Sequence, residues 1–197
     1  IEGLYEDQKQ GEKVKVTCTK SNEGFATAGG VQYVACAGNF KDAGLEYTGA
    51  LKVLQMIFSY EYLWIQIRVK GGAYGCMCSF SDQGDSMFVT YRDPNLSESY
   101  KVYDEAADYV ADFDADDRDM KKYIIGTIGS MDMPMEAVDM GARSFHAYFL
   151  GKTEADLQKV RDQVLSCTQE DIRALAPIVK AVVEAGNRCC IGNEEKI

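Results

Sequence analysis

Residues Arg68-Val-Lys-Gly-Gly-Ala-Tyr74-Gly75 join the end of an amphipathic helix to the start of a β-strand through a pair of glycines. They place a guanidinium and a phenol on either side of the turn. Arginine presents a permanently charged fork of donors, and tyrosine has a neutral hydroxyl donor. Two such donors, held on rigid elements beside a tight turn, suit a grip on a peptide carbonyl. Arg68 and Tyr74 are therefore the candidate functional pair.

Each of these residues also has an ordinary structural explanation. A cation such as Arg68 in the last turn of a helix complements the helix dipole. An aromatic such as Tyr74 at a strand start can pack in the core or at its rim. A helix C-cap explains one glycine of the Gly71-Gly72 pair but explains the second less well. Since glycine also allows a ligand's backbone to approach closely, the residues alone leave both explanations open.

The sequence before this stretch has helical periodicity. An apolar stripe with spacings of three and four residues predicts a helix from about residue 45 to residue 69. Its members are Leu51, Leu54, Phe58, Tyr62 and Ile65, with Ile57 and Trp64 alongside. Alternation with period two predicts a strand at 14–19, and further strands are predicted at 31–37, 73–80 and 86–91. Ser21-Asn-Glu-Gly24 is expected to separate the first two strands, and Ser81-Asp-Gln-Gly84-Asp to form the hairpin turn between the last two.

The second half of the chain is predicted to be mostly helical, with helices at 97–113, 116–130, 134–150, 154–166 and 169–185 and a closing strand at 188–191. Their expected start signals are capping boxes at Asn95–Glu98, Thr153–Asp156 and Thr168–Asp171, with Pro134 in a first turn. This order predicts an α+β fold, a mixed or antiparallel sheet with helices packed on one face. Residues 1–12 are expected to be a linker or loop, and residues 13–197 one domain.

Composition narrows the function classes. The chain of 197 residues is 46% hydrophobic and 26% charged, as in ordinary globular domains. Its net charge of −10 and its lack of a basic stripe argue against nucleic acid and anionic membrane surfaces as partners. No apolar run approaches the roughly 18 residues that span a bilayer. The acidic run at 104–119 has no EF-hand spacing, so it is either a solvated helix junction or an attractor of basic peptides.

The cysteines and the single histidine give little support to a metal centre. Seven cysteines are an odd number, which favours a reducing compartment. Cys76-x-Cys78 and Cys189-Cys190 are weak metal signals, and cysteines in predicted strands usually act as small apolar residues. His146 has no Cys or His at helical spacing, whereas a zinc site needs about three protein ligands. A hydrolytic Ser-His-Asp triad and a phosphate-binding loop also lack their motifs. We therefore expect no metal in this chain.

Two motifs carry a family resemblance. Tyr62-Leu-Trp-x-x-Ile67-Arg68-Val-Lys-Gly-Gly-Ala-Tyr-Gly75, followed by Tyr91-Arg92-Asp93-Pro94-Asn95, resembles the carboxy-terminal part of presequence proteases. These form the falcilysin-containing branch of the pitrilysin/insulinase zinc metallopeptidases. Val31-Gln-Tyr33-Val and Cys190-Ile-Gly192-Asn-Glu-Glu fit the same pattern, so the resemblance extends from about residue 13 to the end.

The resemblance implies four homologous α+β domains, arranged as two halves that close around a peptide. Zinc and a glutamate base would sit in the first domain, in a His-x-x-Glu-His motif that is absent from this chain. The last domain would supply an arginine and a tyrosine that hold the substrate backbone and stabilise the oxyanion. Arg68 and Tyr74 match those positions, and Gly71 and Gly72 match the turn that spaces them and contacts substrate. Cys76 departs from the pattern, since many relatives have another glycine there.

These observations lead to one main expectation and two alternatives. The chain is expected to be the C-terminal domain of a clamshell zinc endopeptidase that degrades short unstructured peptides. Its partners would be the N-terminal catalytic half of the same protein and peptide substrates, and alone it would be inactive. The chain does not begin with Met, so we expect a piece of a longer protein or a processed product, located in the cytoplasm. A non-catalytic peptide-binding subunit of a two-chain peptidase is the alternative, and a cysteine metal or redox module is a weaker third.

Overall fold

The computed structural model of the chain describes residue 17 and residues 22–196. The predicted linker at 1–12 and nearly all of the predicted strand at 14–19 lie outside this range. The elements follow in the order β1 (Glu23–Thr27), β2 (Tyr33–Asn39), η2 (Phe40–Ala43), α1 (Ala50–Tyr60), η3 (Trp64–Lys70), β3 (Gly75–Phe80), β4 (Asp85–Tyr91), α2 (Ser97–Asp104), α3 (Ala106–Ala111), α4 (Asp117–Met131), α5 (Ala137–Phe149), α6 (Glu154–Leu165), α7 (Gln169–Arg173), α8 (Ala176–Glu184) and β5 (Asn187–Asn193).

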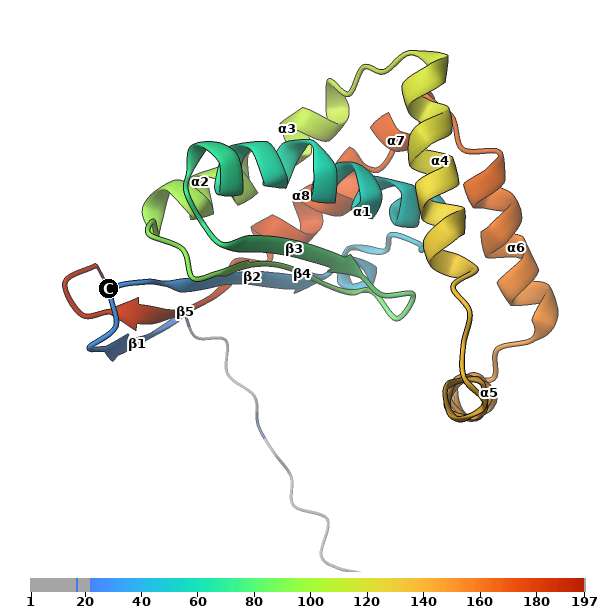
Figure 1. The fold of residues 1–197 in the computed structure, drawn as a ribbon, viewed down its shortest axis with the longest axis horizontal. Coiled ribbons are helices and arrows are strands. Elements are labelled where there is room, and N and C mark those ends of the chain that lie inside the picture. The colour runs from blue at the N-terminus through green and yellow to red at the C-terminus, as the bar shows by residue number, and fades with distance from the viewer. Residues whose placement is uncertain (1–16, 18–21, 197) are drawn as a thin grey trace, which may run out of the picture.

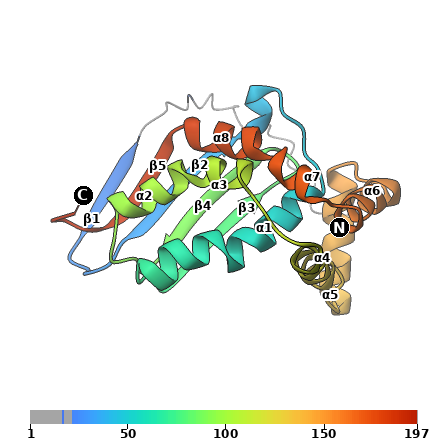
Figure 2. The same cartoon turned by 90° about the horizontal axis from the view of Figure 1, so that it is seen from above.

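The described strands form one mixed sheet in the order β1-β5-β2-β4-β3. β1 pairs with β5 in parallel, and every other pairing is antiparallel. Helices α1, α2, α3 and α8 lie over one face of this sheet, as Figures 1 and 2 show together. The α+β fold with helices on one face is therefore confirmed. The side chains of β4 explain why helices cover only one face. Ser86, Phe88 and Thr90 are buried toward the helices, whereas Met87 and Tyr91 alternate with them on the open face.

Aromatic side chains fill the space between the sheet and helix α1. Phe58 is fully buried, and its ring lies 5.7 Å from Phe88 and 6.4 Å from Phe80, between ring centroids. On the side away from the sheet, the Phe58 ring lies 5.7 Å from Tyr62 and 6.1 Å from Tyr109, again between ring centroids. Large rings in edge-to-face and offset contact contribute much of the buried apolar area, so this cluster holds α1 on the sheet.

The predicted helix at 45–69 forms as two segments. α1 ends at Tyr60, and the chain resumes as the π-helical segment η3 from Trp64 to Lys70. The apolar stripe is correct as far as Tyr62, but Trp64 and Ile65 are 42% and 37% exposed. A π-helix bonds each residue to the fifth along, so the wider turn rotates the helix face. Ile67 takes the buried position instead, and Trp64 and Arg68 come to share the outer side.

Several local predictions are wrong. Residues 21–24 do not simply separate two strands, because β1 begins at Glu23 and pairs with the far end of the chain. The capping box at Asn95–Glu98 does not form: Leu96 is the N-cap of α2, and the Asn95 amide donates to the carbonyl of Gly71 instead. Pro134 precedes its helix, since α5 begins at Ala137 after the N-cap Glu136.

Two other predicted helices are each divided. The helix at 97–113 becomes α2 and α3, which meet at Glu105. The helix at 169–185 becomes α7 and α8, with Pro177 in the first turn of α8. Proline has no N–H and clashes with the carbonyl four residues earlier, so it fits a first turn and not a helix interior. The capping boxes at Thr153 and Thr168 and the hairpin turn at Ser81–Asp85 are confirmed.

Candidate functional site

Arg68 and Tyr74 lie together at the surface, although a turn separates them in sequence. Arg68 is half-buried near the end of η3, and Tyr74, which is 65% exposed, directly precedes β3. The guanidinium carbon of Arg68 lies 5.4 Å from the centre of the Tyr74 ring and 4.7 Å from the centre of the Trp64 ring. Cation–π contacts at this range orient the guanidinium without covering its N–H donors. Both side chains line the same surface depression.

The glycine pair between them closes the π-helical end. The N–H of Gly72 donates to the carbonyl of Arg68 at 3.0 Å, and the N–H of Ala73 donates to the carbonyl of Ile67 at 3.1 Å. Gly72 has φ of +81°, the left-handed region that glycine enters without strain. A Cβ on Gly71 would lie 2.5 Å from the carbonyl oxygen of Ile67. The turn thus requires glycine at both positions, and Gly72 also borders the candidate site.

A second turn, after β4, holds the first in place. The amide of Asn95 donates to the carbonyl of Gly71 at 2.6 Å, and the N–H of Tyr74 donates to the carbonyl of Arg92 at 3.3 Å. Asp93 is fully buried and accepts from the Ser99 hydroxyl at 2.6 Å and from the Asn95 N–H at 2.9 Å. A buried carboxylate with such donors is a rigid anchor.

The positioning roles of Asp93 and Asn95 were missed by the sequence reasoning. The only signal for them was the run Tyr91–Asn95, which contributed to the resemblance without any role assigned to its members.

The surface beside the pair is a shallow depression of about 510 Å³. Its lining is formed by Val31, Arg68, Val69, Gly72, Ala73, Tyr74 and Arg92. Arg92 adds a second guanidinium and has φ of +50°, an uncommon conformation for a residue with a side chain. From here a row of exposed aromatic rings runs over the open face of the sheet, with Tyr74 5.8 Å from Tyr91 and Tyr91 5.5 Å from Tyr33. The site therefore combines charged donors with an uncovered apolar surface.

The neighbouring cysteines are unsuited to chemistry. Burial raises the pKa of the Cys76 thiol to about 11, although the charge of Arg68 acts to lower it. Burial also raises the pKa of Cys78. Since the thiolate is the nucleophile and metal ligand, both groups remain neutral and inert near pH 7. Cys36 and Cys78 are buried, in agreement with the prediction that strand cysteines serve as small apolar residues.

A metal centre finds no support among the residues that the structure describes. They contain no group of three or more His, Cys, Asp or Glu side chains that could hold a metal ion. His146 is exposed on α5.

The acidic run at 104–119 is largely solvated. Asp104 pairs with Arg188 at 2.6 Å, and Asp116 caps α4 by accepting from the N–H groups of Arg118 and Asp119. The hypothesis of a solvated helix junction accounts for these contacts. Separately, within the described part of the chain, no helix combines the length and the apolar character needed to cross a membrane.

Comparisons with known proteins identify the family of the chain. Residues 22–193 match the protein family described as the PreP C-terminal domain. The chain is 44% identical over 178 residues to Protein HypA of Clostridium perfringens, which covers 90% of this chain and 18% of that protein. It is 33% identical over 177 residues to Presequence protease 1, chloroplastic/mitochondrial, of Arabidopsis thaliana, with 89% of this chain and 16% of that protein covered. The chain therefore spans less than a fifth of these curated relatives.

Solved structures share the fold at low sequence identity. The peptidase M16 inactive domain from Pseudomonas fluorescens superposes with a TM-score of 0.63 at 15% identity, covering 88% of this chain and 43% of that one. A putative zinc protease from Bordetella pertussis superposes with a TM-score of 0.61 at 15% identity, covering 82% of this chain and 92% of that one. The chain belongs to the PreP C-terminal domain family, and its fold is that of the pitrilysin/insulinase (M16) peptidase domains.

Proposed function

We propose that this chain is the C-terminal domain of a clamshell zinc metalloendopeptidase that degrades short unstructured peptides. In this role Arg68 and Tyr74 contact the bound peptide in trans to the catalytic zinc. The observation that carries the proposal is the placement of the two donors, which share one exposed surface with the guanidinium carbon 5.4 Å from the phenol ring. The family membership of the chain supports the same assignment.

The described residues do not fit a zinc site, so the metal of the assembled enzyme would belong to the N-terminal catalytic half. That half is the partner we propose for this chain, and peptide is the substrate. This chain alone would then bind peptide without hydrolysing it. The sequence supports this division, since its single histidine cannot supply a His-x-x-Glu-His motif.

The proposed chemistry follows from what each side chain can donate. The Tyr74 hydroxyl donates a hydrogen bond to the oxygen of the scissile carbonyl as it acquires negative charge. The Arg68 fork holds the flanking carbonyls, and its charge favours the same oxyanion. Gly72 lets the peptide backbone approach the turn. Because Asn95 and Asp93 fix the turns, the two donors need little rearrangement when the peptide binds.

The test is the variant Tyr74→Phe in the full-length parent enzyme. It removes one hydroxyl and keeps the ring that contacts Arg68 and Tyr91. Loss of one oxyanion donor typically lowers kcat by about 10²–10³. Zinc content, measured by elemental analysis, should not change.

Tyr91→Phe is the matched control, since it removes a neighbouring exposed hydroxyl from the same aromatic row and should keep nearly normal turnover. Near-normal turnover of Tyr74→Phe would refute the assignment of Tyr74. Arg68→Lys retains the charge but loses the fork, so it should raise KM for peptides.

A non-catalytic peptide-binding subunit of a two-chain peptidase is the alternative function. Such a subunit would bind peptide on the same surface, so the geometry of the site does not distinguish between the two functions. The curated relatives, of which this chain matches 18% and 16%, favour a domain of a longer protein. Sequencing the complete reading frame decides: an upstream His-x-x-Glu-His in the same frame supports the domain, and a start codon near residue 1 beside a zinc-bearing neighbour supports the subunit.

We also place the parent enzyme in the cytoplasm. The six described cysteines, Cys36, Cys76, Cys78, Cys167, Cys189 and Cys190, are all free. Free thiols in this number are typical of a reducing compartment. Cell fractionation with an antibody against this domain tests the location, and recovery from an oxidising compartment would contradict it.

A further inference from the structure

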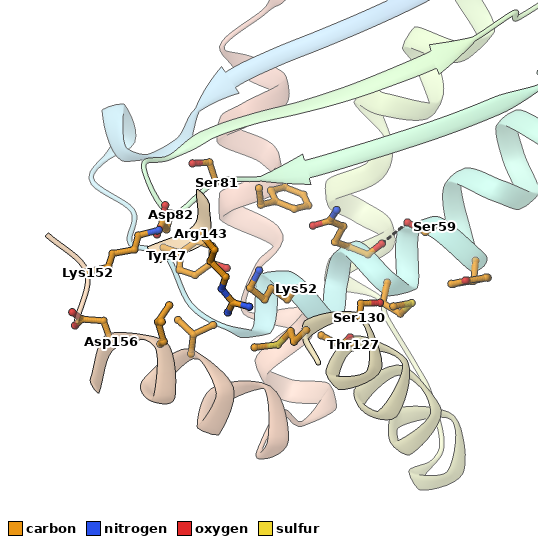
Figure 3. Close-up of a pocket in the computed structure, with 17 residues that line it drawn as sticks. Tyr47, Lys52, Ser59, Ser81, Asp82, Thr127, Ser130, Arg143, Lys152 and Asp156 are labelled. Atoms are coloured by element: carbon orange, nitrogen blue, oxygen red, sulfur yellow. Dashed lines mark hydrogen bonds and ion pairs between the residues drawn. The ribbon is translucent and has the colours of Figure 1, made fainter. Parts of the chain in front are cut away.

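A second hollow lies at the opposite end of β3 from the candidate site. Its volume is about 930 Å³, and its walls come from α1, the β3–β4 turn, α4, α5 and the start of α6. Figure 3 shows side chains from these elements converging on it. The extended chain from Tyr74 to Ser81 spans roughly 20 Å, so the two surfaces are separate. The sequence analysis assigned no role to this region. We call the hollow the α5 cleft.

The charges in the α5 cleft are unbalanced. Three cations, Lys52, Arg143 and Lys152, face two carboxylates, Asp82 and Asp156, which leaves one excess positive charge. Both carboxylates are already engaged, since Asp82 pairs with Lys152 and Asp156 accepts from the N–H and the hydroxyl of Thr153 in a capping box. Among the described residues, Lys52 and Arg143 are the two cleft cations without an ion pair, whereas Lys152 has one.

Lys52 and Arg143 face each other, with Asp82 close enough to Lys52 and Asp132 close enough to Arg143 for their charges to interact. Figure 3 shows their head groups turned toward one another inside the cleft. Among the described residues, Lys52 forms no ion pair, and the recorded bond of the Arg143 side chain is a weak N–H···S contact of 3.8 Å to Met135. Burial lowers the pKa of the half-buried Lys52. The charge of Asp82 acts to raise this pKa, and the charges of Lys152 and Arg143 lower it further. Lys52 is half-buried and Arg143 is exposed, and an anion placed between two opposed cations is attracted by both.

The remaining walls restrict the kind of anion. Met56, Met131 and Leu157 give the cleft an apolar side, which would cover a hydrocarbon group. A single excess positive charge matches a singly charged carboxylate better than a doubly charged phosphate. We infer that the α5 cleft binds the C-terminal carboxylate of a peptide, with the carboxylate between Lys52 and Arg143 and the last side chain against the apolar wall. The inference rests on the proposed function for the identity of the ligand as a peptide.

The test compares an N-acetylated tetrapeptide that ends in leucine, as the free acid and as the C-terminal amide. Isothermal titration calorimetry with the 197-residue chain should show the acid binding at least about 10-fold more tightly, because hydrogen bonds between charged groups are stronger than those to a neutral amide. Lys52→Met and Arg143→Met should each weaken binding of the acid by about 10-fold or more. Lys121→Met, which removes an exposed lysine outside the cleft, is the charge-matched control and should bind normally.

Equal affinity for acid and amide, or no binding of either at millimolar concentration, would overturn the inference without any variant. Normal binding by the Lys52 and Arg143 variants would overturn it as well, and thermal unfolding checks that they are folded. The two proposals fail separately. Tyr74→Phe should leave binding of the acid in the α5 cleft unchanged. If the acid binds in the cleft and the parent enzyme carrying Tyr74→Phe keeps full turnover, only the proposed function is refuted. If Tyr74→Phe loses turnover and the acid does not bind to the 197-residue chain, only the inference about the α5 cleft is refuted.

Discussion

The glycine turn between Arg68 and Tyr74 gives the sharpest stability prediction. Gly72→Ala places a side chain at φ of +81°, where a Cβ meets only Pro94 Cγ at 3.6 Å. Its cost is therefore backbone strain alone, about 1 kcal/mol. Gly71→Ala has ordinary backbone angles, but its Cβ would lie 2.5 Å from the backbone oxygen of Ile67. A backbone atom cannot swing away as a side chain can, so we expect a larger loss of about 2–3 kcal/mol.

Urea unfolding measures this order of stabilities. With a slope of about 2 kcal/mol per molar, Gly71→Ala should lower the midpoint by about 1 M and Gly72→Ala by about half of that. Circular dichroism follows the whole chain, and the fluorescence of Trp64, the single tryptophan, reports on the turn itself. Gly72→Asn should be milder than Gly72→Ala, because asparagine tolerates the left-handed region better.

Gly129→Ala supplies the control of opposite sign. Gly129 lies inside α4, and a Cβ there meets no atom within 4 Å. Replacing it should therefore stabilise the protein by about 0.5–1 kcal/mol through helix propensity. The reasoning fails if Gly71→Ala is as stable as the original chain, or if Gly72→Ala is as harmless as Gly129→Ala. Either result would mean that the turn does not have the geometry described.

Four further outcomes test the core, the caps, the charges and a half-buried thiol. Phe58→Ala should cost about 3–5 kcal/mol, since the ring is fully buried among four other rings, and a loss under 1 kcal/mol in urea unfolding would contradict this packing. Thr168→Ala should cost about 1 kcal/mol by removing the capping box of α7, whereas an unchanged midpoint would show that the cap is dispensable. Burial alone would raise the pKa of Asp82, but the hydrogen bond and charge of Lys152 hold it below its ordinary value. The stability from this pair is therefore present above about pH 4 and is lost as the pH falls through the lowered pKa, so Asp82→Asn should flatten that part of a stability–pH curve. Because the pKa of Cys76 is raised to about 11, iodoacetamide at pH 8 should label it far more slowly in the native chain than in urea, as read by mass spectrometry.

The sequence by itself determined the elements whose signals are local. The predicted strands located β2, β3, β4 and β5, and the Thr-x-x-Asp boxes located the starts of α6 and α7. The glycine pair located the junction of helix and strand. These features depend on contacts between residues close in the chain, such as a hydroxyl and an N–H three positions apart, so the local sequence is sufficient to specify them.

Only the tertiary structure decided the features that depend on distant partners. Residues Glu23–Thr27 form β1 by pairing with β5 at the other end of the chain. The Asn95 side chain does not cap a helix, because its amide donates to the carbonyl of Gly71 instead. The π-helical register, which brings Trp64 beside Arg68, departs from the α-helical spacing written in the sequence. The convergence of Lys52 and Arg143 depends on the packing of α5 and α6 near α1. Such contacts are fixed by the packing of whole elements, which local periodicity does not encode.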